Sequence, residues 1–152
     1  MPKKKNELSE KSIQGKKSRA KGQRFEAKVR QDLEENLGWI VSKWMNTVDL
    51  EKSSKIGKLA LVPAKRKYNP FLKALSIGNG FPDFVCFKRN PNRDYEVIGL
   101  EVKANGYLDK TERDMCVLLL ENKIFSRILI AKNSKDKGKI DYTDFNVKYN
   151  NL

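Results

Sequence analysis

The sequence predicts an α/β fold in which a mixed central β-sheet is flanked by two helices. Helical periodicity spans residues 20–37, and an apolar helix at 109–123 leads into a strand at 125–132. Between the helices, strand-like stretches at 81–88 and 95–104 enclose a turn and form a predicted hairpin. A hairpin followed by a crossover helix and a further strand favours a sheet with antiparallel and parallel pairs. A chain of 152 residues, 39% of them hydrophobic, can fill one such core.

The N-terminal segment differs in composition from the rest of the chain. Residues 1–18 are polar, rich in lysine and without apolar periodicity, which predicts a mobile basic tail. Residues 19–152 then form a single domain. The sequence leaves open whether the tail becomes ordered on a nucleic acid or only adds solubility.

The first predicted helix ends before Gly38 and carries apolar residues at every fourth position: Phe25, Val29, Leu33 and Leu37. On a helical wheel Glu26 falls inside this apolar arc, and Arg30 lies at its edge. Glu26 is therefore the carboxylate that we expect on the core side of this helix. The alternative is that Glu26 extends to solvent beside Arg30. A strand at 39–45 follows the helix.

Residues 46–79 form a long excursion, in which we expect local structure or a contact with substrate. The net charge of the chain is +13, and the excess lies in two segments. Residues 1–24 contain nine basic and two acidic side chains, and residues 52–82 contain seven basic and no acidic ones. This distribution is typical of arms or loops that bind phosphates. We predict nucleic-acid contacts from five side chains: Lys65, Arg66, Lys67, Arg24 and Arg30.

The predicted hairpin brings charged residues into strands that otherwise belong to the core. If its turn centres near Asn92, position i pairs with about position 184 minus i, and Asp83 lies opposite Glu101 within one residue of register. Opposed side chains in such a pair lie about 5 Å apart. Because side chains alternate along a strand, Lys103 shares the face of Glu101, while Leu100 and its alternating neighbours face the core. Asp83, Glu101 and Lys103 therefore form one cluster.

Two opposed carboxylates repel each other unless a divalent cation lies between them or one of them binds a proton. Oxygen donors on two strands favour Mg²⁺ or Mn²⁺ over zinc, and the chain contains no histidine. Cys86, in a strand, and Cys116, in an apolar helix, are predicted to be reduced core residues. The alternative for the cluster is an ion pair of Asp83 or Glu101 with Lys103, which is common in half-exposed hairpins.

The C-terminal part of the chain completes the predicted sheet. Asp109 and Glu112 match a capping box at the start of the helix 109–123. The strand 125–132 is expected to run parallel to the second hairpin strand because a helix connects the two. An extended piece near 139–149 is expected to add an edge strand.

The motif Pro82-Asp83, a spacer, and Glu101-Val102-Lys103 resembles that of the PD-(D/E)XK nuclease superfamily. The resemblance extends over about residues 20–132 and implies a restriction-endonuclease-like core. Members similar to archaeal Holliday-junction resolvases carry a glutamate on the first helix that turns toward the metal site.

Two further positions bear on this resemblance. Glu26 matches the first-helix glutamate of the resolvase-like members. Nucleases of the virus-type replication-repair group often carry a glutamine early in the later helix. The nearest match here is Glu112, which leaves the role of that glutamine open.

The resemblance implies a role for each residue of the cluster. Asp83, Glu101 and the backbone carbonyl of Val102 would hold Mg²⁺ or Mn²⁺. Lys103 would position a water molecule or stabilise charge on the phosphate, and Glu26 would hold a second metal or a metal-bound water. The expected activity is metal-dependent hydrolysis of phosphodiester bonds in duplex DNA. Two alternatives remain: a four-way-junction resolvase, which would act as a homodimer, and a non-catalytic nucleic-acid-binding module.

Hydropathy provides an expectation for localisation. No apolar run approaches the length of a membrane span, and the N-terminus lacks the apolar stretch of a signal peptide. We therefore expect a cytoplasmic protein that does not enter membranes, encoded by a cell, a virus or a mobile element.

Overall fold

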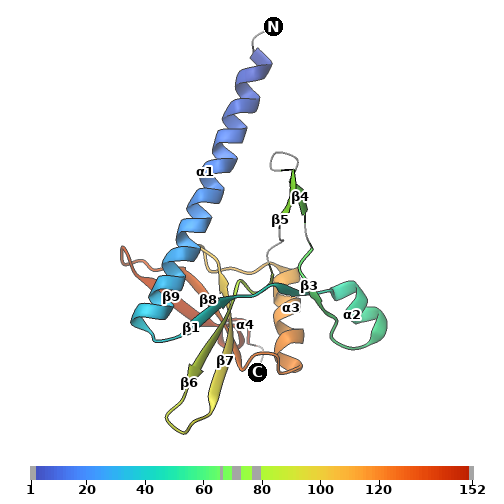
Figure 1. Ribbon diagram of the computed structural model, residues 1–152, viewed down its shortest axis with the longest axis vertical. Helices are drawn as coiled ribbons and strands as arrows, with labels where there is room; N and C mark the ends of the chain where they lie inside the picture. The colour runs from blue at the N-terminus through green and yellow to red at the C-terminus, as the bar shows by residue number, and fades with distance from the viewer. Residues whose placement is uncertain (1–2, 66, 70–72, 77–79, 151–152) are drawn as a thin grey trace.

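The computed structural model describes residues 3–65, 67–69, 73–76 and 80–150. Its centre is a five-stranded sheet in the order β1-β6-β7-β8-β9 (Figure 1). The strands are β1 (Ile40–Lys43), β6 (Phe84–Arg89), β7 (Tyr95–Val102), β8 (Arg127–Asn133) and β9 (Ile140–Asp144). β7 and β8 are parallel, and the other neighbours are antiparallel. The prediction of an α/β fold with a mixed sheet is confirmed.

Helices cover both faces of this sheet. The helices concerned are α1 (Lys3–Gln31), which continues into a π-helical segment η1 (Asp32–Asn36), and α3 (Lys110–Glu121). On one face Val29 and Leu33 share a buried cluster with residues of the central strands: Phe84, Cys86, Ile98, Leu100 and Ala131. On the other face Met115, Cys116 and Leu119 of α3 share a second cluster with Val85, Ile128 and Ile130. The alternation of side chains along β6 and β7 accounts for the two clusters.

The start of α1 differs from the prediction. The helix begins at Lys3, so the structure continues it through the segment that we predicted as an aperiodic tail, and it projects from the body (Figure 1). Apolar periodicity reveals a helix only where the helix packs against something, and the side chains described between residues 10 and 24 are exposed apart from Gly15. Lys, Glu, Gln and Ala form helices without such contacts. Although α1 is long, no helix among the described residues is apolar enough to cross a membrane.

The hairpin and the elements after it agree with the prediction. β6 and β7 pair from Phe84 with Leu100 to Arg89 with Tyr95, which is the predicted register with positions adding to 184. The capping box of Asp109 and Glu112 is present at the start of α3. The predicted edge strand is β9, after which Asp144 caps a short helix, α4 (Phe145–Tyr149).

The long excursion contains the local structure that we expected. β2 (Asn46–Val48) pairs with β3 (Leu61–Pro63), and between them lies α2 (Leu50–Ile56), which Asp49 caps and Gly57 ends in the left-handed conformation. β4 (Lys67–Asn69) and β5 (Ala74–Ser76) form a second hairpin. This hairpin projects from the same side of the body as α1 (Figure 1).

Candidate active site

Asp83 and Glu101 lie next to each other where the β6–β7 hairpin joins the rest of the molecule. Because Phe84 opposes Leu100, the next position along places Asp83 opposite Glu101. The backbone N–H of Asp83 donates to Glu101 Oε2 at 3.0 Å, and the backbone N–H of Val102 donates to Asp83 Oδ2 at 2.8 Å. Each carboxylate therefore uses one oxygen to bind the backbone of the opposite strand.

Close packing fixes the backbone around this pair. A Cβ at Gly99 would lie 2.8 Å from Cγ of Pro82 and 3.1 Å from Cδ2 of Phe125. Only glycine leaves room for Pro82 against β7 at this point. The backbone N–H of Trp44 also donates to the carbonyl of Asp83, at 3.1 Å. These contacts hold the residue before β6 against both of its neighbouring strands.

Burial dominates the electrostatics of the pair. Asp83 is 8% exposed and Glu101 is 5% exposed. Burial, opposed in part by the hydrogen bond from Val102, raises the pKa of Asp83 to about 6. Burial and the neighbouring Asp83 raise the pKa of Glu101 to about 9. The protein by itself therefore stabilises two negative charges poorly at this position.

Lys103 lies beside the pair and is held by α3. Its Nζ is 2.7 Å from Glu112 Oε2 and 3.8 Å from Glu101 Oε1. Glu112 uses its other oxygen, Oε1, to accept from the backbone N–H of Asp109 in the capping box. Burial alone would lower the pKa of Lys103, but the hydrogen bond to Glu112 and the charge of Glu101 raise the pKa above its ordinary value. Glu112 thus keeps Lys103 charged and fixes it relative to α3.

Glu26 reaches the same region from the opposite face of the sheet. Its Oε2 lies 3.3 Å from Nζ of Lys43, and the two side chains are 30% and 35% exposed. The charge of Glu26 raises the pKa of Asp83 and that of Lys43 lowers it, so both residues lie within electrostatic reach of the pair. The alternative partner that we considered for Glu26, Arg30, is engaged elsewhere.

Arg30 has a role within the fold. Its Nε donates to Glu34 Oε1 at 3.0 Å, and its Nη2 donates to the carbonyl of Val41 at 3.1 Å. Val41 belongs to β1, the edge strand, so Arg30 binds a carbonyl of that strand. Arg30 thus joins the end of α1 to η1 and to β1, and its predicted contact with a nucleic acid stays a prediction.

Of the other four predicted nucleic-acid contacts, the structure describes the side chains of two. Arg24 is exposed on α1, and Lys65 is exposed just after β3. Arg66 lies outside the described residues. Lys67 belongs to β4, and its side chain is outside the described part of the chain as well.

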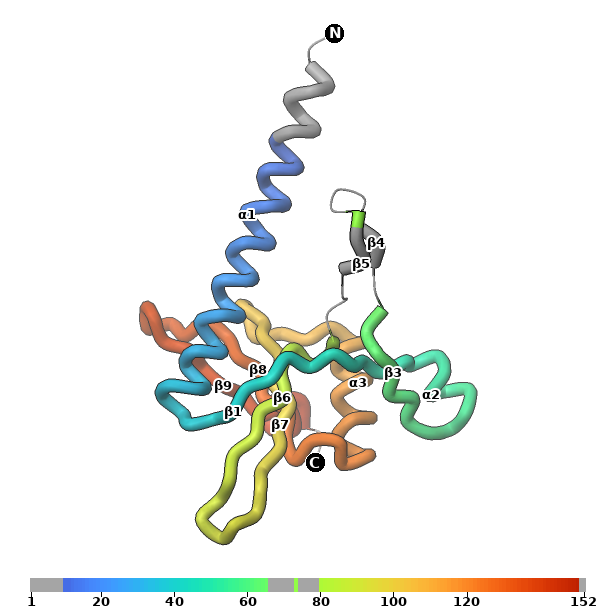
Figure 2. Tube along the Cα trace, viewed as in Figure 1, coloured from blue at the N-terminus to red at the C-terminus, as the bar shows by residue number. Residues whose placement is uncertain are grey.

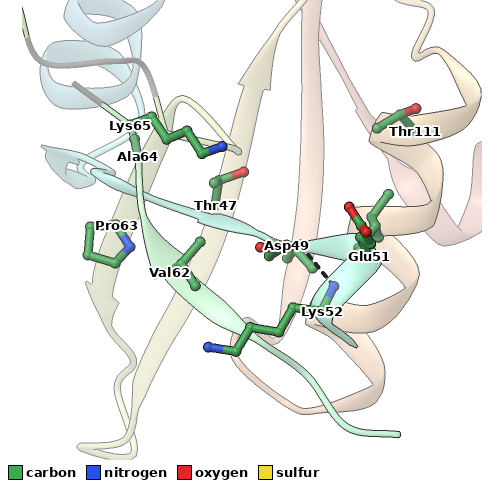
Figure 3. Close-up of a pocket in the computed structure, with 11 residues that line it drawn as sticks. Thr47, Asp49, Glu51, Lys52, Val62, Pro63, Ala64, Lys65 and Thr111 are labelled. Carbon is green, nitrogen blue, oxygen red and sulfur yellow. Dashed lines mark hydrogen bonds between the residues drawn. The ribbon is translucent and has the colours of Figure 1, made fainter. Parts of the chain in front are cut away.

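A cleft of about 800 Å³ lies between the β2–β3 hairpin, the start of α2 and the start of α3. Lys65 and Lys52 line it together with hydroxyl and carboxylate groups, and Thr111 contributes from α3 (Figure 3). Asp49 accepts from the backbone N–H of Lys52 within the cleft wall. Thr111 precedes Glu112, so this cleft adjoins the element that holds Lys103.

The donor chemistry of the pair fits a hard divalent cation. Asp83 and Glu101 are adjacent oxygen donors whose negative charges the protein balances poorly. One oxygen of each carboxylate accepts from a backbone N–H, and the other oxygen accepts from neither of these two N–H groups. Over the described ranges, however, no group of three or more His, Cys, Asp or Glu side chains is arranged to hold a metal. The third carboxylate of the predicted set, Glu26, is paired with Lys43. The cation would therefore be held by two carboxylates.

Sequence reasoning missed one residue of the site and left a second undecided. Lys43 was missed, although it opposes Phe84 across β1 and β6 and so lies one position from Asp83. Glu112 was predicted as a cap with no assigned contact to Lys103. Both cysteines are buried and free, as predicted.

Comparisons with known proteins return no match: no family model matches the chain, and no curated protein or solved structure is similar enough to be matched. The resemblance to PD-(D/E)XK nucleases therefore stays a prediction. The function must be inferred from the residues of the site.

Proposed function

We propose that this protein is a metal-dependent phosphodiesterase that cleaves duplex DNA. The observation that carries the proposal is the buried pair of Asp83 and Glu101, with the charged Lys103 beside it. A carboxylate pair with raised pKa values is costly to the fold on its own. Perturbed pKa values of this kind are typical of sites that perform chemistry.

Asp83 and Glu101 would hold a divalent cation, which when bound polarises the scissile phosphate and lowers the pKa of a coordinated water. Lys103 would donate to a phosphate oxygen and stabilise the negative charge that develops there in the transition state. Glu112 would orient Lys103 through the 2.7 Å ion pair. The backbone hydrogen bonds of the pair would hold both carboxylates in place before substrate arrives.

The charge of the chain supports a nucleic acid as the substrate. The basic excess lies in the segments 1–24 and 52–82, and the basic side chains that the structure describes in both segments are exposed. Lys65 lines the cleft that adjoins the start of α3. A polyanion bound at the site would meet both segments.

A cleavage assay tests the proposal. The protein is incubated with linear duplex, supercoiled circular and four-way-junction DNA, each with Mg²⁺, Mn²⁺ or EDTA. We expect cleavage of duplex DNA that requires the metal and falls by about 10³-fold in Asp83→Asn and Glu101→Gln. Asp136→Asn, which changes an exposed carboxylate in the β8–β9 turn, serves as the matched control and should cleave normally.

Two other outcomes would favour the alternatives. Paired symmetric nicks confined to the junction, made by a dimer, would favour the resolvase. Binding of DNA without metal-dependent cleavage of any substrate would overturn the enzyme and favour a non-catalytic binding module. Cleavage at the wild-type rate in both carboxylate variants would place the active site elsewhere.

A further inference from the structure

The N-terminal two-thirds of α1 forms a rod that touches little of the body. Figure 1 shows α1 extending away from the sheet, and the coloured part of α1 in Figure 2 follows the same course. From residue 10 to residue 24 the side chains are exposed apart from Gly15, and burial begins at Phe25 and Val29. We call residues 3–24 the basic rod. Among residues 10–24 of the rod, whose side chains the structure describes, none is buried.

The described part of the basic rod carries an excess of cations that form no ion pair with another described residue. Its described side chains include one acid, Glu10, and six bases: Lys11, Lys16, Lys17, Arg19, Lys21 and Arg24. The ion pairs of the described chain involve none of these bases. These bases can therefore bind an anionic partner without first breaking an ion pair of the described chain.

The lower end of the rod meets the sheet next to the candidate site. A groove of about 340 Å³ separates α1 from the end of β7. Lys21 and Glu26 line it on one side, and Val102 lines it on the other. Val102 donates its backbone N–H to Asp83. An anionic chain that followed the rod toward the sheet would thus arrive, on the α1 face, at the end of β7 whose backbone binds Asp83.

We propose that the basic rod is a docking surface for the phosphate backbone of duplex nucleic acid that extends outward from the site. This inference rests on the proposed function for the identity of the site, and it adds a binding surface beyond it. At 1.5 Å per residue the rod is about 33 Å long, close to one turn of a B-form duplex of about 34 Å. A partner able to use its whole length must carry regularly spaced charge over that distance, as a duplex does.

The composition of the rod argues against the other large polyanion, a membrane surface. An interfacial helix requires a continuous apolar face opposite its charged one. Between residues 3 and 24 the large aliphatic residues are Leu8 and Ile13, and Ile13 is exposed. The rod therefore has the charge for anionic lipid without the apolar face needed to insert.

The test compares two triple variants of the full chain. One removes charge from the rod: Lys11→Gln, Lys17→Gln and Lys21→Gln. The matched control removes the same charge at the tip of the β6–β7 hairpin and after α3, where the side chains are also exposed: Arg89→Gln, Arg93→Gln and Lys123→Gln. Gln and Lys have similar helix propensity, so circular dichroism should show α1 intact.

Affinity for a labelled 30-base-pair duplex is measured by fluorescence anisotropy in EDTA, between 50 and 200 mM salt. Each phosphate contact contributes about 0.9 to the slope of log affinity against log salt, so three lost contacts reduce the slope by about 2.7. Over this salt range the wild type should lose about 40-fold more affinity than the rod variant. The hairpin control should keep the wild-type slope.

Equal slopes in the rod variant and the wild type would overturn the inference, as would an equal loss in the control. So would charge-dependent binding of the rod to phosphatidylserine vesicles with unchanged duplex affinity. Because EDTA prevents cleavage, this assay is independent of the proposed chemistry. Duplex binding through the rod by a protein that cleaves nothing would leave the docking surface standing and remove the proposed activity.

Discussion

The end of the β6–β7 hairpin and the basic rod of α1 both concentrate charge, under opposite physical conditions. Asp83 and Glu101 are almost completely buried, and their pKa values are raised to about 6 and about 9. The six bases of the rod whose side chains the structure describes are exposed and have no partner among the described ion pairs. One region holds charge that is largely shielded from bulk water, and the other displays charge where salt screens it.

This difference separates two tasks. Buried charge interacts strongly and over short range, so a small displacement of Asp83 or Glu101 changes the energy of the pair considerably. Exposed charge interacts weakly per residue but adds over many contacts. The hairpin end is suited to chemistry at one bond, and the rod is suited to holding a long anion. Variants in the two regions should therefore respond to different variables, pH in the first and salt in the second.

The largest expected effect on stability comes from pH. Because the pKa of Asp83 in the folded protein lies above its unfolded value of 3.8, the native state binds more protons between the two values. The free energy of unfolding of the metal-free protein should therefore fall as the pH rises. Asp83 contributes a fall of about 3 kcal/mol between pH 3.8 and pH 6. Glu101 should extend the fall toward pH 9. Urea unfolding in EDTA measures this.

The comparison of the two regions supplies controls for this experiment. Asp83→Asn should make the fall below pH 6 shallower because one of the two titrating groups is gone, and Glu101 should still contribute above its ordinary pKa of 4.5. The triple lysine variant of the rod should retain the wild-type pH dependence, since its charges are exposed. Mg²⁺ should raise stability more at pH 8 than at pH 5 in the wild type. A metal-free protein whose stability increases between pH 4 and pH 8 would contradict the burial argument.

A smaller effect is expected at Glu112, which links α3 to Lys103. Glu112→Gln removes the charge that faces Lys103 at 2.7 Å while an amide oxygen can still accept from Asp109. We expect kcat to fall about tenfold with KM unchanged, as for other residues that orient a catalytic group. Glu112→Ala should show the same loss of activity and in addition lose about 1 kcal/mol of stability with the cap.

Glu121→Gln is the matched control for this series, because it changes an exposed carboxylate at the other end of α3. It should leave kcat, KM and stability at their wild-type values. Wild-type kcat in Glu112→Gln would mean that the ion pair with Lys103 is structural, and the proposed orientation of Lys103 would be wrong.

The parts of the fold that local patterns specify were predicted correctly. The hairpin register follows from a turn and two alternating strands, and the start of α3 follows from a capping box; both signals lie within a short stretch of chain. α2 was not predicted because seven residues offer no apolar periodicity, even though Asp49 and Gly57 mark its ends. The extension of α1 to Lys3 was missed because periodicity measures burial, and the rod is not buried.

The candidate site shows the same division. The strand pattern placed Asp83, Glu101 and Lys103 together, because all three belong to one hairpin. Lys43 could be found only by knowing that β1 pairs with β6, which depends on the order of strands in the sheet. The ion pair of Glu112 with Lys103 depends on how α3 is rotated against the sheet, which a capping pattern does not fix.

The smallest expected effect concerns Glu26, which lies between the two regions in exposure. Its ion pair with Lys43 is partly solvated, so it contributes at most about 1 kcal/mol. Glu26→Gln should reduce the cleavage rate about threefold, since its charge reaches Asp83, and leave duplex affinity unchanged. Glu34→Gln breaks an ion pair of similar exposure with Arg30 and should alter neither quantity. If both variants cleave at the wild-type rate, the charge of Glu26 has no part in cleavage. Glu26 is then one more surface charge of α1, and α1 contributes no residue to the active site.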